Sequence, residues 1–331
     1  MKNKRIGVLM GGMSPERDVS MTSGEAISAA LEARGYEVVK VVVDHDLDQT
    51  LRQKPIDVAF IALHGSYGED GCVQGLLEFL RIPYTGPGVA ESALCMDKLK
   101  TKELFQLHNV PTPPYYAVRR RDMPELESRQ RNFGFPVFVK PRRQGSSIGA
   151  GRAESLEELR LRCEEGLAFD DCVLVERFIA GRELAIGVLD GKALGAIEIV
   201  PKGGAYDYKA KYTRGQTDYY FPARLSPEEQ TEVMRLSERA AYAVDTGGAI
   251  RLDVLLSTGG NPYVLEVNTL PGMTPTSLLP KIAAGVGMDF GDLCEAILSR
   301  AQLNVRIQGE ASATNATKNE AASVTHSLAL E

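Results

Sequence analysis

The sequence predicts an α/β protein with α+β elements, in which a doubly wound parallel-sheet domain comes first. Short apolar strands at residues 5–9, 38–43 and 57–63 each precede a helical pattern, and this alternating order is typical of a parallel sheet. From Pro111 onward, strands and turns alternate as in paired hairpins, which indicates a second, α+β part. The tail, residues 306–331, is rich in Ala, Ser, Thr and Asn without hydrophobic periodicity, so we expect it to be disordered.

The first helix of the chain has a clear start signal. Ser14 is expected to be its N-cap, Pro15 its first helical residue, and Gly35 its stop. Further helices are expected at 46–53 and 71–80. Ligands of parallel sheets bind at the carboxyl ends of the strands. Two loops hold that position: residues 11–17 and 64–71.

The second part is expected to hold strands and helices in mixed order, followed by two hairpins. Its strands are placed at 115–118, 136–140, 148–152 and 172–178, and its helices at 122–132 and 155–167. The first hairpin turns at Asp190-Gly191 between strands 182–189 and 193–200. A helix at 227–244 then leads into the second hairpin.

The second hairpin carries a group of polar side chains. Gly259-Gly260 signals a two-residue turn, so that Thr258 pairs with Asn261. Asp253 then lies opposite Glu266, and Arg251 lies opposite Asn268, all on one face because strand side chains alternate. The apolar residues project to the other face, as a core: Leu252, Val254, Leu256, Tyr263, Leu265 and Val267.

Directly opposed carboxylates repel each other, so we expect a cation between Asp253 and Glu266. Carboxylate and amide oxygens suit Mg²⁺, which commonly binds one or two carboxylates together with phosphate oxygens. The alternative is a solvated polar face on which Arg251 screens the acids, because repulsion at a wet surface is small.

Composition limits the class of protein. The 331 residues carry a net charge of −6 and a pI near 5.5, which argues against nucleic acid or membrane as a partner. The five scattered cysteines have no metal-binding spacing, so we expect reduced thiols and a cytoplasmic protein. The apolar run at residues 6–10 is too short for a signal peptide, and no stretch is long enough to span a membrane.

A strand ending in Lys140 enters a loop that contains Gly145, Ser146, Ser147 and Gly149. Glycine permits close approach of a ligand, and successive N–H groups with two hydroxyls can cradle a phosphate. The loop does not have the Walker A spacing. An ordinary hairpin loop explains the same residues.

Three further segments are ambiguous. Residues 174–179, with Glu176, suit either a purine pocket or a core strand, and Glu183 is equally open. Near residue 11, free helix N–H groups and Glu16 suit an amino acid, but a well-capped helix accounts for the same pattern. His64 follows a strand of the first sheet and suits either a ligand contact or a structural role. The same two alternatives hold for the Gly272 N–H and for Ser277, which follow the acidic strand.

Taken in order, these motifs resemble the D-alanine–D-alanine ligases of the ATP-grasp superfamily, over about residues 4–302. The resemblance rests on several spaced motifs. They are residues 11–20, 62–65, 68–71, 96–99, 139–141, 145–147, 206–212, 251–253 and 266–274.

The resemblance implies a two-lobed ATP-grasp fold that binds ATP and two Mg²⁺ or Mn²⁺ ions. Lys98, Lys140 and the loop with Gly145, Ser146 and Ser147 are expected at the phosphates, and Lys211 near the transferred group. The adenosine pocket is assigned to Glu176, Arg177, Ile179 and Glu183. The metal ligands are assigned to Asp253, Glu266, which is shared by both ions, and Asn268.

The resemblance also implies how D-alanine is held. Glu16, His64, Ser277 and Leu278 are expected to bind it, while Arg251 and the Gly272 N–H stabilise oxyanion charge. Glu16, Ser146 and Tyr212 resemble the family's hydrogen-bonded trio that closes the 206–216 loop. Arg177 stands where a lysine is frequent, and Arg142 and Gln144 lie in a stretch taken as variable.

The implied reaction joins two D-alanines through an acyl phosphate, releasing ADP and phosphate, for peptidoglycan precursor synthesis. The expected parts are a substrate domain at 1–96, a small lobe at 97–179, a large lobe at 180–305 and the tail. A homodimer is expected. The alternative acceptor is D-lactate, against which Tyr212 argues. A regulatory ATP-binding module is disfavoured because the metal residues are present, and a dehydrogenase because the glycine fingerprint is missing.

Overall fold

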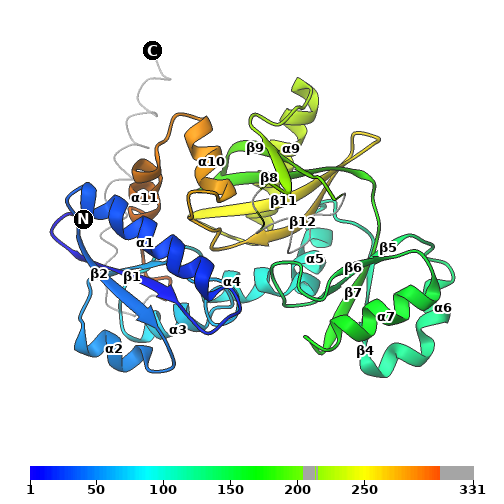
Figure 1. The fold of residues 1–331 in the computed structure, drawn as a ribbon, viewed down its shortest axis with the longest axis horizontal. Coiled ribbons are helices and arrows are strands. Elements are labelled where there is room, and N and C mark those ends of the chain that lie inside the picture. Colours follow the sequence, from blue (N-terminus) through cyan, green and yellow to red (C-terminus); the bar gives the residue numbers. More distant parts are fainter. Residues whose placement is uncertain (204–212, 214, 306–331) are drawn as a thin grey trace, which may run out of the picture.

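The computed structural model describes residues 1–203, 213 and 215–305, whose strands form three β-sheets that follow one another along the chain (Figure 1). Lys211, Tyr212 and the tail lie outside the described residues. Parallel and antiparallel sheets both occur, as the predicted α/β class with α+β elements requires.

The first sheet is parallel, as predicted, with strand order β2-β1-β3. Its strands are β1 (Arg5–Gly11), β2 (Glu37–Val43) and β3 (Val58–Ile61). The central strand β1 is apolar on both faces because helices cover both, and Ile6, Val8, Leu9 and Met10 are fully buried. The carboxyl ends of β1 and β3 therefore meet at one edge, where the next loops begin.

The helices of this part are α1 (Arg17–Ala33), α2 (Leu47–Gln53) and α3 (Cys72–Phe79). The predicted start at Ser14 is wrong, because α1 begins at Arg17. The Ser14 hydroxyl instead donates to the His64 carbonyl at 2.7 Å and accepts the Glu16 N–H at 3.2 Å. The serine thus joins the loops after β1 and β3.

Two consecutive helices, α4 (Val89–Met96) and α5 (Lys98–Leu107), lead to a second sheet. This antiparallel sheet has the order β4-β7-β5-β6. Its strands are β4 (Tyr115–Arg119), β5 (Val137–Pro141), β6 (Gly151–Ala153) and β7 (Cys172–Arg177). Its helices are η1 (Arg120–Glu125), α6 (Leu126–Gln130) and α7 (Leu156–Gly166).

The third sheet is antiparallel, with the order β10-β9-β8-β11-β12. Its strands are β8 (Gly181–Leu189), β9 (Lys192–Pro201), β10 (Thr217–Tyr220), β11 (Ala249–Ser257) and β12 (Pro262–Asn268). Helix α9 (Pro227–Ala243) covers one face. Helix α10 (Leu278–Gly285) packs Leu278 and Ile282 on the other.

The β11–β12 hairpin differs from the prediction at its turn. Ser257 pairs with Asn261 around a three-residue loop whose last residue, Gly260, has φ +79°. A bulge between Asp253 and Val254 then shifts the register by one. Beyond the bulge, Asp253 lies opposite Glu266 and Arg251 opposite Asn268, as predicted.

The bulge also overturns part of the predicted core face. Val254 lies opposite Val264, which is fully buried, whereas Tyr263 and Leu265 are only partly buried. One extra residue in β12 reverses the alternation on the turn side of the bulge. Leu252, Val254, Leu256 and Val267 are buried, as predicted.

The last helix, α11 (Phe290–Leu298), returns to the first sheet and lies beside α1 (Figure 1). Leu293 and Cys294 are buried in the same core as Ile6 and Ile27. At the end of α1, Arg34 meets three carboxylates around α11. Their N···O distances are 2.6 Å for Asp289, 2.7 Å for Asp292 and 2.5 Å for Glu295.

The observed register predicts an unequal effect of two neighbouring truncations. Val264→Ala should cost about 2 kcal/mol of stability, since it removes buried methyl groups and leaves a cavity. Leu265→Ala removes more carbon but should lower the thermal unfolding midpoint less, because Leu265 is partly exposed. A larger loss for Leu265→Ala in matched thermal melts would contradict the bulge.

Candidate active site

A cavity of about 520 Å³ lies where loops of the first sheet, the glycine loop and the third sheet meet. Glu16 and His64 line it from the carboxyl edge of the first sheet, and Gly145 and Ser146 from the glycine loop. The third sheet and the segment after it supply the remaining predicted residues that line the cavity: Arg251, Glu266, Asn268, Gly272, Ser277 and Leu278.

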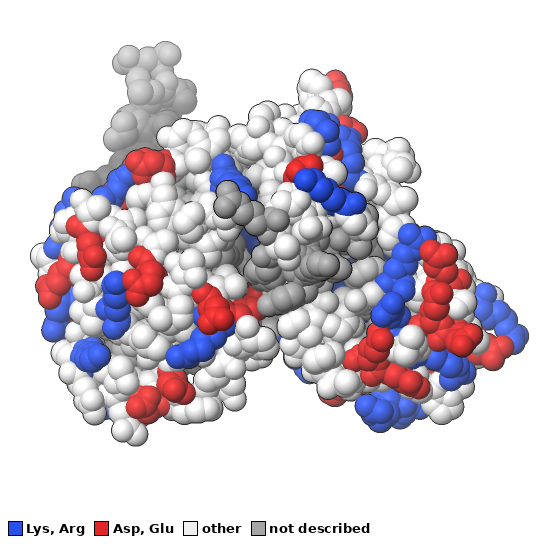
Figure 2. All heavy atoms as spheres, viewed as in Figure 1, with Lys and Arg blue, Asp and Glu red and all other residues white. Residues whose placement is uncertain are grey.

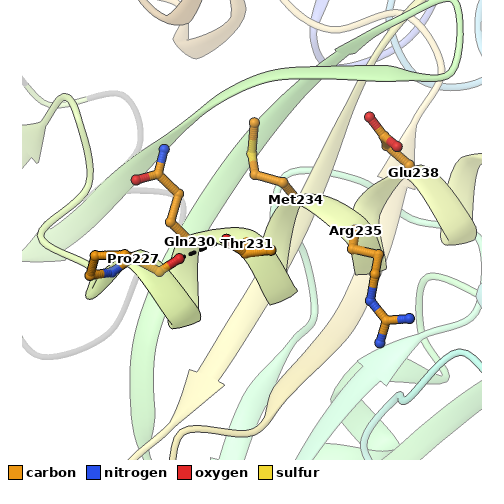
Figure 3. Close-up of a pocket in the computed structure, with 6 residues that line it drawn as sticks. All are labelled: Pro227, Gln230, Thr231, Met234, Arg235 and Glu238. Carbon is orange, nitrogen blue, oxygen red and sulfur yellow. Dashed lines mark hydrogen bonds between the residues drawn. The ribbon is translucent and has the colours of Figure 1, made fainter.

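A second hollow runs along α9, and Figure 3 shows its side chains projecting from that one helix. Its lining residues are Pro227, Gln230, Thr231, Met234, Arg235 and Glu238. Since no other element supplies a lining group, the hollow lacks the converging polar groups of a ligand site. We therefore take the first cavity as the candidate site.

The acidic pair on the hairpin is offset by cations from two elements. Arg251 donates to both Asp253 carboxylate oxygens, at 2.7 and 2.9 Å, and the Asn268 amide lies 3.3 Å from one of them. The Lys98 ammonium lies 3.6 Å from Glu266. The alternative in which Arg251 screens the acids therefore matches the observed ion pair.

The donor set nevertheless fits a hard divalent cation. Asp253 and Glu266 are opposed across the hairpin, and Asn268 adds an amide oxygen on the same face. Within the described residues no cluster of three or more His, Cys, Asp or Glu side chains could hold a metal ion. A magnesium ion would thus need phosphate oxygens to complete its shell, which is its usual mode of binding.

The lysines of the predicted phosphate site are held by acids. Lys140, at the end of β5, lies 2.8 Å from Glu176 of β7, which is buried. Lys98 also donates to the Gln144 carbonyl at 2.6 Å, at the start of the glycine loop. The lysine predicted for phosphate and the carboxylate predicted for adenosine are therefore direct neighbours.

Arg142 has a structural role that the sequence did not suggest. It is buried and binds Asp97 through two guanidinium nitrogens. Asp97 is also the N-cap of α5, where its side chain accepts the Lys100 N–H at 3.2 Å. Substitution at this pair would release both the helix start and the strand that leads into the glycine loop. The description of the stretch around Arg142 as variable stays a prediction.

The glycine loop has an uncommon backbone conformation. Ser146 and Ser147 have φ of +50° and +59°, a left-handed region that non-glycine residues rarely occupy. The Ser146 hydroxyl donates to a Glu16 carboxylate oxygen. Two members of the predicted trio therefore meet, while the third, Tyr212, lies outside the described residues.

One ring nitrogen of His64 has no hydrogen-bond partner among the described residues. Its Nδ1 lies 3.1 Å from the Leu270 carbonyl, so Nδ1 carries the proton and Nε2 is an acceptor. Nε2 is buried and has no hydrogen-bond partner in the part of the chain that the structure describes. Burial lowers the pKa of the imidazole, although the Glu16 carboxylate acts in the opposite direction. The lowered pKa keeps Nε2 unprotonated.

Ser277 and Gly272 are packed together after the acidic strand. The Ser277 hydroxyl accepts the Thr274 N–H at 3.0 Å and lies 2.8 Å from the Thr274 hydroxyl. A Cβ at Gly272 would lie 2.8 Å from the Ser277 oxygen, so only glycine fits there. Gly272 and Ser277 both line the cavity.

Known proteins resemble this chain over nearly its whole length. Families described as D-ala D-ala ligase N-terminus and C-terminus match residues 46–87 and 104–299. The D-alanine–D-alanine ligase of Geobacter sulfurreducens is 49% identical, covering 94% of this chain and 98% of the relative. The chain belongs to the D-alanine–D-alanine ligase family.

Solved structures agree with this assignment. The Bacillus anthracis D-alanine–D-alanine ligase complexed with ATP has a TM-score of 0.77 at 34% identity, covering 89% of this chain and 96% of that one. The VanG D-Ala:D-Ser ligase of Enterococcus faecalis has a TM-score of 0.79 at 27% identity, covering 89% and 98%. The predicted ATP-grasp fold is thereby confirmed.

Several residues assigned by family resemblance lie outside the cavity wall. Arg177 is exposed and donates to the Phe133 carbonyl at 3.1 Å. Ile179 and Glu183, which follow it in the sequence, are partly buried. Lys98, Lys140, Ser147, Glu176 and Asp253 also do not line the cavity. These residues are spread over α5, the glycine loop, the second and third sheets and the segment between β7 and β8, and their roles stay predictions.

Glu69 and Lys102 were missed as individual site residues. Glu69 lines the cavity and accepts the Gly65 N–H at 2.7 Å. Burial, together with the nearby Glu16 carboxylate, raises the pKa of Glu69 to about 8. The motif at residues 68–71 contained Glu69, and Lys102 follows Lys98 by one helical turn, so both signals were present in the sequence.

The raised pKa of Glu69 predicts a pH-dependent stability difference. The native state holds the proton up to about pH 8, whereas the unfolded chain loses it near 4.5, so this contribution is lost as pH rises between them. Glu69→Gln keeps the acceptor for Gly65 but stays neutral. Its melting temperature relative to wild type should therefore rise from pH 5 to pH 8.5.

The exposed Glu32→Gln serves as the control, because it should show no such trend. If the melting-temperature difference of Glu69→Gln is the same at both pH values, Glu69 is ionised throughout.

Proposed function

We propose that this protein joins two D-alanine molecules in an ATP-dependent reaction that releases ADP and phosphate. The observation that carries the proposal is the meeting of three groups at one cavity. These are the acceptors of the first sheet, the glycine loop, and the Arg251–Glu266 face of the hairpin. Membership of the D-alanine–D-alanine ligase family supports the same activity.

The acceptors suit the ammonium group of the first D-alanine. Glu16, Glu69 and His64 all line the cavity, and Nε2 of His64 has no partner among the described residues. A cation there would relieve repulsion between the two carboxylates. Without that cation, burial and Glu16 keep Glu69 protonated. We infer that substrate binding and proton release from Glu69 are coupled.

The chemistry proceeds in two steps. ATP transfers its terminal phosphoryl group to the carboxylate of the first D-alanine, giving an acyl phosphate and ADP. The amine of the second D-alanine attacks the carbonyl carbon, the carbon–nitrogen bond forms, phosphate leaves, and the amine loses its proton. Arg251 and the Gly272 N–H are proposed to stabilise the oxyanion that develops at this carbon.

Lys98, Lys140 and the glycine loop are proposed to hold the phosphates. Asp253, Glu266 and Asn268 would hold one or two Mg²⁺ ions, which supply positive charge for phosphoryl transfer. Arg251 must release Asp253 for that carboxylate to bind metal, and the guanidinium is then available for the oxyanion. Replacing Arg251 by metal at Asp253 would therefore complete the metal site and free Arg251 to stabilise the oxyanion.

The activity itself is tested by phosphate release from ATP with D-alanine and Mg²⁺. Product analysis with D-alanine or D-lactate as acceptor distinguishes an amide-forming ligase from an ester-forming one. The proposal fails if folded protein releases phosphate without regard to D-alanine, or makes only the ester.

Glu266→Gln should nearly abolish turnover. We expect kcat to fall by a factor of about 100 or more, because a shared metal ligand and its charge in the transition state are lost. The fold should persist, since Glu266 is partly exposed and glutamine has the same shape. Steady-state kinetics at increasing Mg²⁺ measure the effect. Full recovery at saturating Mg²⁺ would exclude the shared-ligand role.

We further propose a homodimer, assembled through the exposed face of α3. Cys72, Leu76 and Phe79 lie at helical spacing on this face, and the Phe79 side chain is 91% exposed. Exposed apolar faces of this kind commonly mark protein contacts. Charge on this face should therefore prevent association.

Sedimentation of the wild type should give twice the 36.0 kDa chain mass, and Phe79→Asp should give the monomer. Tyr242→Asp, at an aromatic residue that is 77% exposed on α9, is the matched control and should remain dimeric. A wild type that sediments as a monomer, or a dimeric Phe79→Asp, would contradict the proposed interface.

The remaining assignments are also proposals. All five cysteines are free thiols and four are buried, which supports a reducing cytoplasm. Figure 2 shows basic and acidic side chains interspersed over one face, which supports small molecules rather than nucleic acid as partners. No helix in the described ranges is long and apolar enough to cross a membrane. The division at residues 96, 179 and 305 is retained as a proposal.

A further inference from the structure

Helix α5 directs two lysines inward, one turn apart. Lys98 approaches Glu266, whereas Lys102 is only 1% exposed and lies 2.9 Å from Glu176. The Lys102 ammonium also donates to the Thr112 hydroxyl and lies 5.3 Å from the centre of the Tyr115 ring. A lysine is seldom buried so completely unless it is paired, so these contacts fix its position.

Glu176 is shared by two ammonium groups. It is 3% exposed, and its carboxylate lies 2.9 Å from Lys102 and 2.8 Å from Lys140. Burial opposes ionisation, but Lys102 and then Lys140 hold the pKa of Glu176 below its usual value. The carboxylate is therefore charged and carries one negative charge between two positive ones.

This sharing has a consequence for Lys140. With Lys102 present, the Glu176–Lys140–Lys102 group keeps a net positive charge, which attracts a phosphate. Without Lys102, Glu176 and Lys140 become an isolated neutral pair, and the attraction of Lys140 for an anion is largely cancelled.

We propose that Lys102 is a positioning residue for the nucleotide: it neutralises Glu176 so that the charge of Lys140 remains available to ATP. The inference rests on the proposed ATP site but assigns a role to a lysine outside the cavity wall. Lys102 acts through Glu176 and Lys140 and touches no substrate.

The protonation of Lys102 offers a readout that a purely structural role would not give. Burial lowers the pKa of Lys102 to about 8, with Glu176 raising it and Lys140 lowering it. The charged or titratable neighbours are Glu176 on β7, Lys140 on β5, Tyr115 on β4 and Glu266 on β12. Burial raises the pKa of Tyr115, so this phenol stays neutral while Lys102 titrates.

The experiment measures binding of a non-hydrolysable ATP analogue by calorimetry, with Mg²⁺ and without D-alanine, so that no substrate amine titrates. Lys102→Met should weaken binding about tenfold or more, because Glu176 then cancels most of the charge of Lys140. Lys102→Arg, which keeps the charge, should restore part of the affinity. Lys100→Met is the control, because Lys100 lies on the same helix in an exposed pair with Glu103.

In steady-state assays, Lys102→Met should raise the KM for ATP but leave the KM for D-alanine within about twofold, which is within ordinary context effects. An equal rise in both constants would show general disruption and overturn the proposal. So would a folded Lys102→Met protein with wild-type affinity for the analogue.

The wild-type protein tests the inference even if Lys102→Met does not fold. Its affinity for the analogue should fall as pH rises from 7 to 9.5, with a midpoint near the pKa of about 8. A flat profile over that range overturns the role of Lys102. Failure of ligation itself would appear separately, as analogue binding without D-alanine-dependent phosphate release.

Discussion

The opposition of two carboxylates at one end of the β11–β12 hairpin is the constraint on which the site depends. Asp253 and Glu266 face each other directly, an arrangement that destabilises a sheet unless positive charge is near. Arg251 supplies that charge from the same strand, and Lys98 supplies it from α5. The Lys98–Glu266 contact joins α5, which follows the first sheet, to β12 of the third sheet. The repulsion between the two carboxylates therefore helps to set the position of α5 relative to the hairpin.

Charged side chains of helix α5 contact the strand and loop around the glycine motif, the hairpin and the buried Glu176. Asp97 at its N-cap binds Arg142, which fixes the strand leading into the glycine loop. Lys98 contacts both Glu266 and the start of that loop, and Lys102 contacts Glu176 one turn later. Residues three or four positions apart lie on the same face of a helix, so one short helix can place lysines against carboxylates of two different sheets.

The sequence predicted the parallel sheet and the acidic pair because both follow from local patterns, namely apolar strand runs and strand alternation. It did not predict contacts made by side chains with partners far along the chain. Ser14 has every local property of an N-cap, but its hydroxyl binds the His64 carbonyl. Lys102 resembles a solvated helix lysine until the position of Glu176 is known. Likewise, the family motifs named the site residues, but the contacts between them came only from the fold.

The hairpin shows why a correct pairing can follow from an incorrect turn. The three-residue loop at Gly260 alone would place Asp253 opposite Leu265 and turn Glu266 toward the core. A buried, unpaired glutamate is costly, whereas Val264 fills the core without penalty. The bulge beside Asp253 resolves this conflict: the turn side follows the packing of Val264, and the site side keeps both acids on the ligand face. Register at the site is therefore set by burial and charge rather than by the turn.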